Sequence, residues 1–296
     1  MTQQTFFVFD DLSCVGKRSP LGWWARADCP SVRTSLGGIM GRVMAATLLF
    51  SVASAYDDTY HSIYDPPLQP EWPANESAIS VACVGDSITA GYLSTGGLTY
   101  PNQLQRLLGS GYRVMNFGEG GRTMLKHGDN PYWISPGYKR ALASNASLLV
   151  LMLGTNDAKY ANWGHLASEF PGDYADMIAS FANMQPRPKI WLMVPPPLYR
   201  AGTYGMNQTV INSLFPASDG AAAVRTVANA ANLVEPIDLY SLFQSHCPVT
   251  GGTPGHPPNQ TLIPCDWIAR GGTDACHPND VGYGKIAEAV KTAIAP

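Results

Sequence analysis

Ser87, Asp274 and His277 have the side-chain types that together turn a serine into a nucleophile. A serine hydroxyl attacks a carbonyl carbon only when a base within hydrogen-bond reach takes its proton. Histidine suits that task near neutral pH, and a carboxylate can fix its tautomer and its orientation. Asp274 stands three residues before His277, so we expect Asp274 to orient His277 and His277 to activate Ser87. The chemistry that these residue types predict is acyl transfer.

Acyl transfer also requires hydrogen-bond donors around the oxyanion of the tetrahedral intermediate. Gly121 lacks a Cβ and can present an unobstructed backbone N–H, and Asn156 can offer its side-chain amide. The backbone N–H of Ser87 is a third candidate donor. We interpret the neighbouring carboxylates of Asp86 and Asp157 as hydrogen-bonding scaffold rather than as acid catalysts.

The elements that must position these residues follow from the hydrophobic pattern. Apolar runs of strand length occur at 78–84, 112–117, 148–153, 189–194 and 233–238. Helical patterns alternate with them at 100–108, 170–181, 220–231 and 282–295. This alternation predicts a parallel sheet that is covered by helices on both faces. In such sheets functional sites lie at the carboxyl ends of the strands, and three of the candidate segments begin where a predicted strand stops.

Four short segments carry a family resemblance: GDSIT at 85–89, NFGEGG at 116–121, GTND at 154–157 and DACHPN at 274–279. They resemble, in the same order, the four sequence blocks of the SGNH (GDSL) hydrolases, over roughly 78–295. The resemblance implies a three-layer α/β/α sandwich of the flavodoxin-like kind with a parallel five-stranded sheet. It also implies that no metal or cofactor is required.

Within that family the blocks supply a serine, a glycine, an asparagine and a histidine to catalysis, with an aspartate three residues before the histidine. The resemblance therefore assigns these roles to Ser87, Gly121, Asn156, His277 and Asp274. Gly121 is preferred over Gly118 because it fills the last glycine position of its block. The family mechanism proceeds through an acyl-enzyme on the serine.

A closer likeness within the family points to a substrate. The segments at 100–104, 126–133 and 153–163 look like those of sialate O-acetylesterase-like or carbohydrate-esterase-like members, which implies small acyl groups, often acetyl, on sugars. Trp133 and Trp163, with Tyr132, are candidates for stacking on a sugar ring, with core packing as the equal alternative. An insert at 246–270 departs from the family pattern, beside the predicted catalytic loop, and leaves the substrate open.

Two alternatives stay open at this stage. The same three residues would serve a lysophospholipase or a thioesterase acting on longer acyl chains, although the sequence shows no apolar lid. A protein of a different class, a secreted glycan-binding glycoprotein without turnover, could keep the fold. None of the expected catalytic residues is missing, which favours an enzyme.

Composition and charge exclude two classes of partner. The chain has 296 residues and a formal net charge of −3, with no basic stripe of the kind that nucleic-acid binding requires. No apolar run reaches the roughly 18 residues of a membrane span, so stable membrane insertion is not expected. The predicted partner is a small-molecule or glycan ester substrate, and the sequence does not indicate an oligomeric state.

An internal segment has the features of a secretory signal peptide. An apolar run at 43–55 follows Arg42 and ends in the small residues Ala53-Ser54-Ala55. We expect translation to start at Met40 or Met44, which makes 1–39 a non-native or disordered extension and 40–55 the signal peptide. The chain would continue as an extended lead-in at 56–76 and a hydrolase domain at 77–296.

Two further features agree with a secreted protein. N-glycosylation acceptor patterns start at Asn75, Asn145, Asn207 and Asn259. Of the four cysteines after the signal segment, Cys83 lies in an apolar run and is predicted to be a buried hydrophobe. One disulfide is expected among Cys247, Cys265 and Cys276, with the pairing open. Their spacings contain no CxxC pair, so a zinc site is not expected.

Overall fold

The computed structural model describes residues 7–9, 12–14, 77–200, 202–214, 223–247, 265–269 and 274–295. The chain divides into two units, residues 1–56 and 57–296. In the first unit the described part is an antiparallel pair, β1 (Phe7–Phe9) and β2 (Leu12–Cys14). The predicted signal peptide at 40–55, the lead-in at 56–76 and the rest of the predicted extension at 1–39 lie outside the described residues.

The second unit is built on a five-stranded parallel sheet, which confirms the predicted α/β class. Its strands are β3 (Ile79–Gly85), β4 (Tyr112–Gly118), β5 (Leu148–Met152), β6 (Lys189–Val194) and β7 (Ile237–Asp238). Their spatial order is β4-β3-β5-β6-β7, the flavodoxin-like order expected from the family resemblance. The register pairs Gly85 at the end of β3 with Gly118 of β4 and with Met152 of β5, so these three strands end side by side.

The strands form where apolar residues run without interruption, because both faces of a parallel sheet are covered. Residues 81–84 of β3 have no exposed surface. The last predicted strand, 233–238, is wrong in length, since only Ile237 and Asp238 pair with β6. Pro236 stands immediately before this pair, and proline has no N–H to donate to a ladder.

The predicted helices are confirmed with small shifts at their ends. They are α2 (Tyr100–Leu108), α5 (Phe170–Ala182), α7 (Ala223–Ala230) and α9 (Asp280–Ile294). The other helices of the described residues are α1 (Ser87–Ala90), α3 (Pro136–Leu142), α4 (Tyr160–Leu166), α6 (Gln208–Leu214) and α8 (Leu239–His246). Single 3₁₀ turns are η1 (Gly109–Gly111), η2 (Tyr132–Ile134), η3 (Asn156–Ala158) and η4 (Thr203–Gly205).

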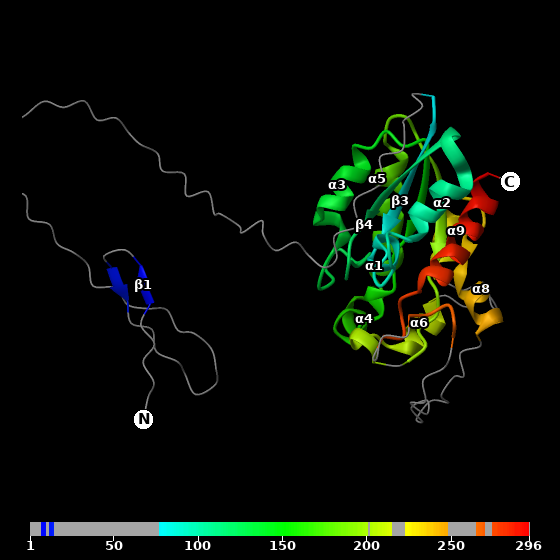
Figure 1. The fold of residues 1–296 in the computed structure, drawn as a ribbon. Coiled ribbons are helices and arrows are strands. Elements are labelled where there is room, and N and C mark those ends of the chain that lie inside the picture. The colour runs from blue at the N-terminus through cyan, green and yellow to red at the C-terminus, as the bar shows by residue number, and fades with distance from the viewer. Residues whose placement is uncertain are drawn as a thin grey trace, which may run out of the picture. The chain divides into compact units, whose positions relative to one another are not determined.

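The helices complete three layers around the sheet. Helices α2 and α9 pack against each other on one face, whereas α3 and α5 lie on the other (Figure 1). Helices α1, α4 and α6 gather near the carboxyl ends of the strands (Figure 1). That edge therefore carries the segments that follow β3, β4 and β5. Among the described residues, every helix is too short or too polar to span a bilayer.

Candidate active site

Ser87 is the first residue of α1, directly after strand β3. Asp86 caps this short helix, because its Oδ1 accepts the backbone N–H of Ile88 at 2.9 Å. Gly91 ends the helix in the left-handed conformation, with φ 92°. Gly85 precedes the turn, and a Cβ there would meet the backbone oxygen of Met152 at 2.5 Å. The turn thus fixes Ser87 at the edge of the sheet, where it is 7% exposed.

His277 and Asp274 meet Ser87 from the loop before α9. The Nε2 atom of His277 lies 2.8 Å from the Ser87 Oγ, and its Nδ1 atom lies 2.6 Å from the Asp274 Oδ2. All three side chains are buried. The structure therefore brings together the three residues that the sequence predicts to act together, in the order serine, histidine and aspartate.

The Asp274 carboxylate is held as an anion by several donors. Its Oδ1 accepts the backbone N–H groups of Cys276 and His277, each at 2.9 Å. Burial alone would raise its pKa, but the hydrogen bond and charge of His277 and the two N–H groups lower that pKa to about 2. At neutral pH Asp274 is therefore ionised and accepts the Nδ1 proton, which leaves Nε2 free to accept from Ser87.

Ser87 and His277 line a cavity of about 330 Å³. The other lining residues come from the loops after β4 and β5 and from two flanking segments: Tyr92, Gly120, Gly121, Asn130, Thr155, Asn156, Lys159, Tyr204, Met206 and Cys276. Both predicted side-chain and backbone donors, Asn156 and Gly121, are thus in the cavity with Ser87. The cavity is where an ester carbonyl would meet the Ser87 hydroxyl.

The two candidate glycines of the β4 segment occupy different places. Gly121, at φ 74°, lines the cavity, as does Gly120, which the sequence analysis did not select. Gly118 instead packs against α1, and a Cβ there would meet the backbone nitrogen of Ala90 at 2.1 Å. The loop is fastened by Arg122, which binds Glu119 at 2.8 Å and the Oδ1 of Asn130 at 2.7 Å.

Asn156 is buried in η3 and is oriented by a carboxylate beneath it. Its Nδ2 donates to the Asp86 Oδ2 at 3.3 Å. Burial raises the pKa of Asp86 to about 6, against the opposing effects of the Ile88 N–H and of nearby His277 and Lys159. Asp86 thus links the cap of α1 to the amide of Asn156.

Asp157 holds the segment that follows the β4 loop. Its two oxygens accept the backbone N–H groups of Met124 and Leu125, at 2.9 and 2.7 Å. Burial raises the pKa of Asp157 to about 7, although the two N–H groups oppose that rise. Asp157 has no exposed surface and does not line the cavity, which agrees with its interpretation as scaffold.

The two tryptophans selected as substrate contacts lie elsewhere, and neither lines the cavity. The indole N–H of Trp133 donates to the backbone oxygen of Met124 at 2.7 Å. Trp163 packs edge-on against Phe170, with ring centroids 5.6 Å apart. Both side chains pack against the hydrophobic core, as the alternative interpretation predicts.

The aromatic residues at the cavity are instead Tyr92 and Tyr204, which the sequence analysis did not select. Their rings stand edge-on to the His277 imidazole, with centroids 4.6 Å and 5.6 Å from it. The Tyr204 hydroxyl donates to the Asp274 Oδ2 at 2.8 Å. Neither residue belongs to one of the four segments, and no local pattern in the sequence marks them.

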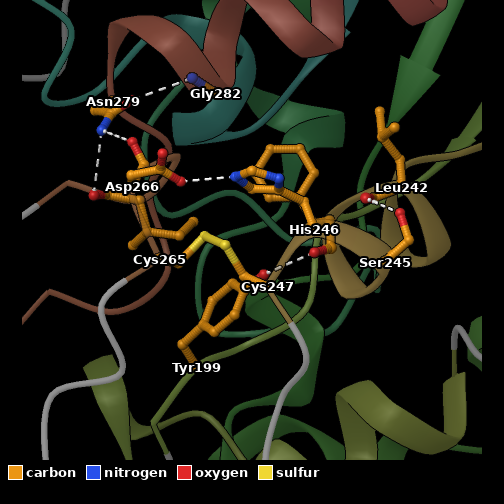
Figure 2. Close-up of a disulfide and its surroundings, with 11 residues drawn as sticks. Tyr199, Leu242, Ser245, His246, Cys247, Cys265, Asp266, Asn279 and Gly282 are labelled. Carbon is orange, nitrogen blue, oxygen red and sulfur yellow. Dashed lines mark hydrogen bonds and ion pairs between the residues drawn. A yellow bond between two sulfur atoms is a disulfide. The ribbon is translucent and has the colours of Figure 1, made fainter.

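A disulfide braces the loop that carries His277. Cys247, at the end of α8, is bonded to Cys265, whereas Cys83 and Cys276 are buried free thiols. Figure 2 shows Asp266 between His246 and Asn279: the His246 Nε2 lies 2.7 Å from its Oδ1, and Asn279 donates to its backbone oxygen at 2.7 Å. One predicted disulfide is thus present, in a pairing that the sequence left open.

The segment beyond the disulfide runs beside the loop that carries His277. Ala269 donates its N–H to the backbone oxygen of His277 at 2.9 Å, and Asn279 donates its N–H to that of Trp267 at 2.9 Å. Asn279 in turn caps α9, accepting the N–H of Gly282 at 3.1 Å (Figure 2). The segment that begins at the disulfide therefore pairs with the backbone from His277 to Asn279.

One group of described residues, His246, Cys247 and Asp266, gathers the kinds of atom that bind metals. The Cys247 sulfur is consumed by the disulfide and cannot act as a thiolate ligand. The donors that remain are one histidine and one carboxylate, already bonded to each other. This group therefore does not fit a metal site of the kind that cysteine and histidine clusters form.

Comparison with known proteins gives three kinds of likeness. A family model described as the GDSL-like Lipase/Acylhydrolase family matches residues 83–285. An acetylxylan esterase of Xylanibacter ruminicola is 34% identical over 242 residues, which cover 74% of this chain and 44% of that protein. The chain thus spans less than half the length of this curated relative.

Two solved structures share the fold. An acetyl xylan esterase is 23% identical, with a TM-score of 0.51. The match covers 73% of this chain and 100% of that protein's chain. A carbohydrate acetylesterase from Sinorhizobium meliloti is 18% identical, with a TM-score of 0.52, over 73% of this chain and 98% of the other. At these identities the likeness concerns the arrangement of the sheet and helices.

Proposed function

Because the chain belongs to the GDSL-like lipase/acylhydrolase family of carboxylic ester hydrolases, we propose that it removes short acyl groups, chiefly acetyl, from carbohydrate. The observation that carries this proposal is the 2.8 Å contact between the Ser87 Oγ and the His277 Nε2 inside a cavity of about 330 Å³. A serine paired with an oriented histidine, open to a cavity with amide donors, is suited to acyl transfer.

In the proposed mechanism the Ser87 Oγ attacks the ester carbonyl carbon while His277 Nε2 takes the hydroxyl proton. The Ser87 and Gly121 N–H groups and the Asn156 amide stabilise the oxyanion. The tetrahedral intermediate collapses, the bond to the sugar oxygen breaks, and His277 returns the proton to that oxygen. The acyl group then remains on Ser87 as an ester.

The second half repeats these steps with water as the nucleophile. His277 takes a proton from water, the resulting hydroxide attacks the acyl carbon, and the same donors hold the new oxyanion. Collapse breaks the bond to the Ser87 Oγ, which recovers its proton from His277, and the carboxylic acid leaves. Asp274 stays ionised throughout and stabilises the imidazolium that forms in each half.

The proposed substrate rests on the relative and on the cavity. The relative from Xylanibacter ruminicola bears the name acetylxylan esterase, which supports an acetyl group on a polysaccharide as substrate. The cavity volume of about 330 Å³ is at the small end of the range for ligand pockets. A pocket of this size suits an acetyl group with part of a sugar ring better than a long acyl chain.

We also propose that the protein acts outside the cell, from its signal-like segment at 43–55 and its four acceptor asparagines. Of these, Asn145 is exposed, with φ 52°, in the segment between α3 and β5. Mass spectrometry of the protein from culture medium would test both points. A mature N-terminus upstream of Met40 would contradict the proposed signal peptide.

One assay tests the activity and its substrate class together. Acetylated xylo-oligosaccharide, p-nitrophenyl acetate and p-nitrophenyl octanoate are offered to the wild type and to the Ser87→Ala variant. We expect the wild type to release acetate from the first two and the variant to release none. Equal, negligible release by both proteins would favour a glycan-binding protein, and preference for octanoate would favour a lysophospholipase or thioesterase.

A further inference from the structure

Tyr204 makes a contact with the orienting carboxylate that the serine mechanism does not require. Its hydroxyl donates to the Asp274 Oδ2 at 2.8 Å, and its ring lies edge-on to His277. Tyr204 comes from η4, which lies far in sequence from every one of the four catalytic segments. Its side chain lines the cavity.

The oxygen that accepts the Tyr204 hydroxyl is the one that faces the imidazole. Asp274 Oδ2 lies 2.6 Å from the His277 Nδ1 and 2.8 Å from the Tyr204 oxygen. Its Oδ1 is already taken by the N–H groups of Cys276 and His277. Each oxygen of the Asp274 carboxylate thus has two hydrogen-bond partners. The Tyr204 hydroxyl and the His277 imidazole both bind the negatively charged Oδ2.

The backbone at Tyr204 is in a conformation that bulky residues avoid. Its φ of 50° and ψ of 27° place it in the left-handed region, between Gly202 and Gly205, both at φ 76°. Such a conformation is unfavourable for a residue with a Cβ, and it persists only where the surroundings impose it. Observed strain of this kind is typical of residues held in place at an active site.

The surroundings that impose this conformation are the segments next to Asn156. Gly202 donates its N–H to the backbone oxygen of Met206 at 3.0 Å, which closes the turn around Tyr204. Met206 pairs with Lys159 in an antiparallel bridge, and Asn207 donates its N–H to Ala158 at 2.8 Å. The turn is therefore anchored on Ala158, the last residue of η3, and on Lys159, which follows it.

We propose that Tyr204 is a positioning residue that acts through Asp274, fixing the carboxylate and limiting the charge that it presents to His277. The expected change in kcat rests on the proposed function, whereas the expected change in the NMR signals of His277 does not. Desolvation and the Asp274 carboxylate beside it raise the pKa of Tyr204 above its usual value. The phenol therefore stays protonated and remains a donor across the working pH range.

Several other polar groups face this cluster and are left unchanged by the test. They are the hydroxyls of Ser87 and Tyr92, the thiol of Cys276, the carboxylate of Asp86 and the ammonium of Lys159. Removing the Tyr204 hydroxyl leaves Asp274 with one donor fewer on Oδ2. The freed charge then attracts the imidazole more strongly, which favours the protonated ring.

The test compares Tyr204→Phe with Tyr160→Phe, which changes an exposed tyrosine of α4 that does not line the cavity. In the proton NMR spectrum of the ligand-free protein, we expect Tyr204→Phe to shift the downfield signal of the His277 Nδ1 proton. It also moves the titration of the imidazole carbon-bound protons to higher pH. Tyr160→Phe leaves both unchanged.

The kinetic arm uses the acetyl ester that the wild type hydrolyses. We expect Tyr204→Phe to lower kcat about tenfold with little change in KM, as loss of one hydrogen bond to a charged group predicts. The acidic limb of its kcat/KM profile moves to higher pH, in step with the NMR titration. Circular dichroism and the melting temperature of both variants establish that they fold.

Three outcomes separate the inference from the proposed function. An unchanged Nδ1 signal and an unchanged imidazole titration in Tyr204→Phe would overturn the positioning role. A raised KM with an unchanged signal would overturn it in favour of a direct substrate contact. A wild type without esterase activity, but with the predicted NMR shifts, would sink the proposed function and leave the positioning role intact.

Discussion

The His277 Nε2 lies 2.8 Å from the Ser87 Oγ, although 190 residues of sequence separate the two. This contact predicts that the two residues act as one unit. We expect Ser87→Ala and His277→Ala each to lower kcat for an acetyl ester by about 10⁴-fold or more, and the double variant to lose little beyond that.

Steady-state rates with p-nitrophenyl acetate measure these losses. Ser180→Ala, which removes an exposed hydroxyl from α5, is the matched control and should keep the full rate. Multiplied losses in the double variant would mean that the two residues work independently, against the proposed mechanism.

Substitution by alanine should lower mainly the activity at Gly121 and mainly the stability at Gly118. A Cβ on Gly121 would lie 3.3 Å from the Asn130 Nδ2, in a backbone at φ 74°. We expect Gly121→Ala to disturb the oxyanion donor and lower kcat by about 100-fold, with at most about 1 kcal/mol lost in stability. Gly118→Ala drives a Cβ into the Ala90 backbone and should cost about 3 kcal/mol or more.

Urea unfolding and kcat, measured on both glycine variants, test this separation. A fully active Gly121→Ala protein would remove the Gly121 N–H from the proposed oxyanion site. A stable Gly118→Ala protein with reduced kcat would transfer that role to Gly118.

Asp157→Asn should weaken the fold, since an amide cannot accept both the Met124 and the Leu125 N–H groups as the carboxyl oxygens do. We expect a loss of about 2 kcal/mol in the free energy of unfolding at pH 5. Burial raises the pKa of Asp157 to about 7, above its value near 3.8 in the unfolded chain. The stability that it contributes is therefore fully present below pH 4 and is lost as the pH rises through 7.

The gap between the wild type and Asp157→Asn should accordingly narrow from pH 5 to pH 8. Urea unfolding at several pH values measures it, with Asp176→Asn on the exposed side of α5 as the control. A gap that widens toward pH 8 would show that the ionised carboxylate is the stabilising form.

Asp274 predicts the opposite pH dependence. Its folded pKa of about 2 lies below the unfolded value near 3.8, so its contribution is present above pH 4 and is lost as the pH falls toward 2. The difference corresponds to about 2 kcal/mol. We expect Asp274→Asn to lower the free energy of unfolding by that amount at pH 6, and by progressively less below pH 4.

Acid titrations of urea unfolding for the two proteins measure this change, with the same Asp176→Asn control. A difference between wild type and Asp274→Asn that stays constant from pH 6 to pH 2.5 would contradict the assignment of a lowered pKa. It would also weaken the view that His277 rests against a permanently ionised partner.

The sequence predicted the sheet and the meeting of Ser87, His277 and Asp274 because local rules govern both. Buried strands require uninterrupted apolar runs, and parallel strands deliver their carboxyl ends to one edge. The length of β7 was missed because a single proline overrides an apolar run. Tyr204 could not be predicted, since its role depends on a left-handed backbone and on a partner 70 residues away.

For the two tryptophans the sequence left two interpretations equal, sugar stacking and core packing. An aromatic residue in a loop near the catalytic segments has the composition of a sugar platform. Only its packing shows whether such a residue contacts a ligand or the hydrophobic core. Trp133 and Trp163 pack against the core. Where a flat side chain points is a tertiary property that residue type and spacing do not encode.

The docking of α9 against α2 has a consequence for folding. Ser87, Gly121 and Asn156 all precede His277 in the sequence, and His277 contacts Ser87 only when the loop ahead of α9 is in place. If His277 activates Ser87 as proposed, a chain in which α9 is detached from α2 would hold a serine without its base. Loss of esterase turnover would then report the undocking of α9.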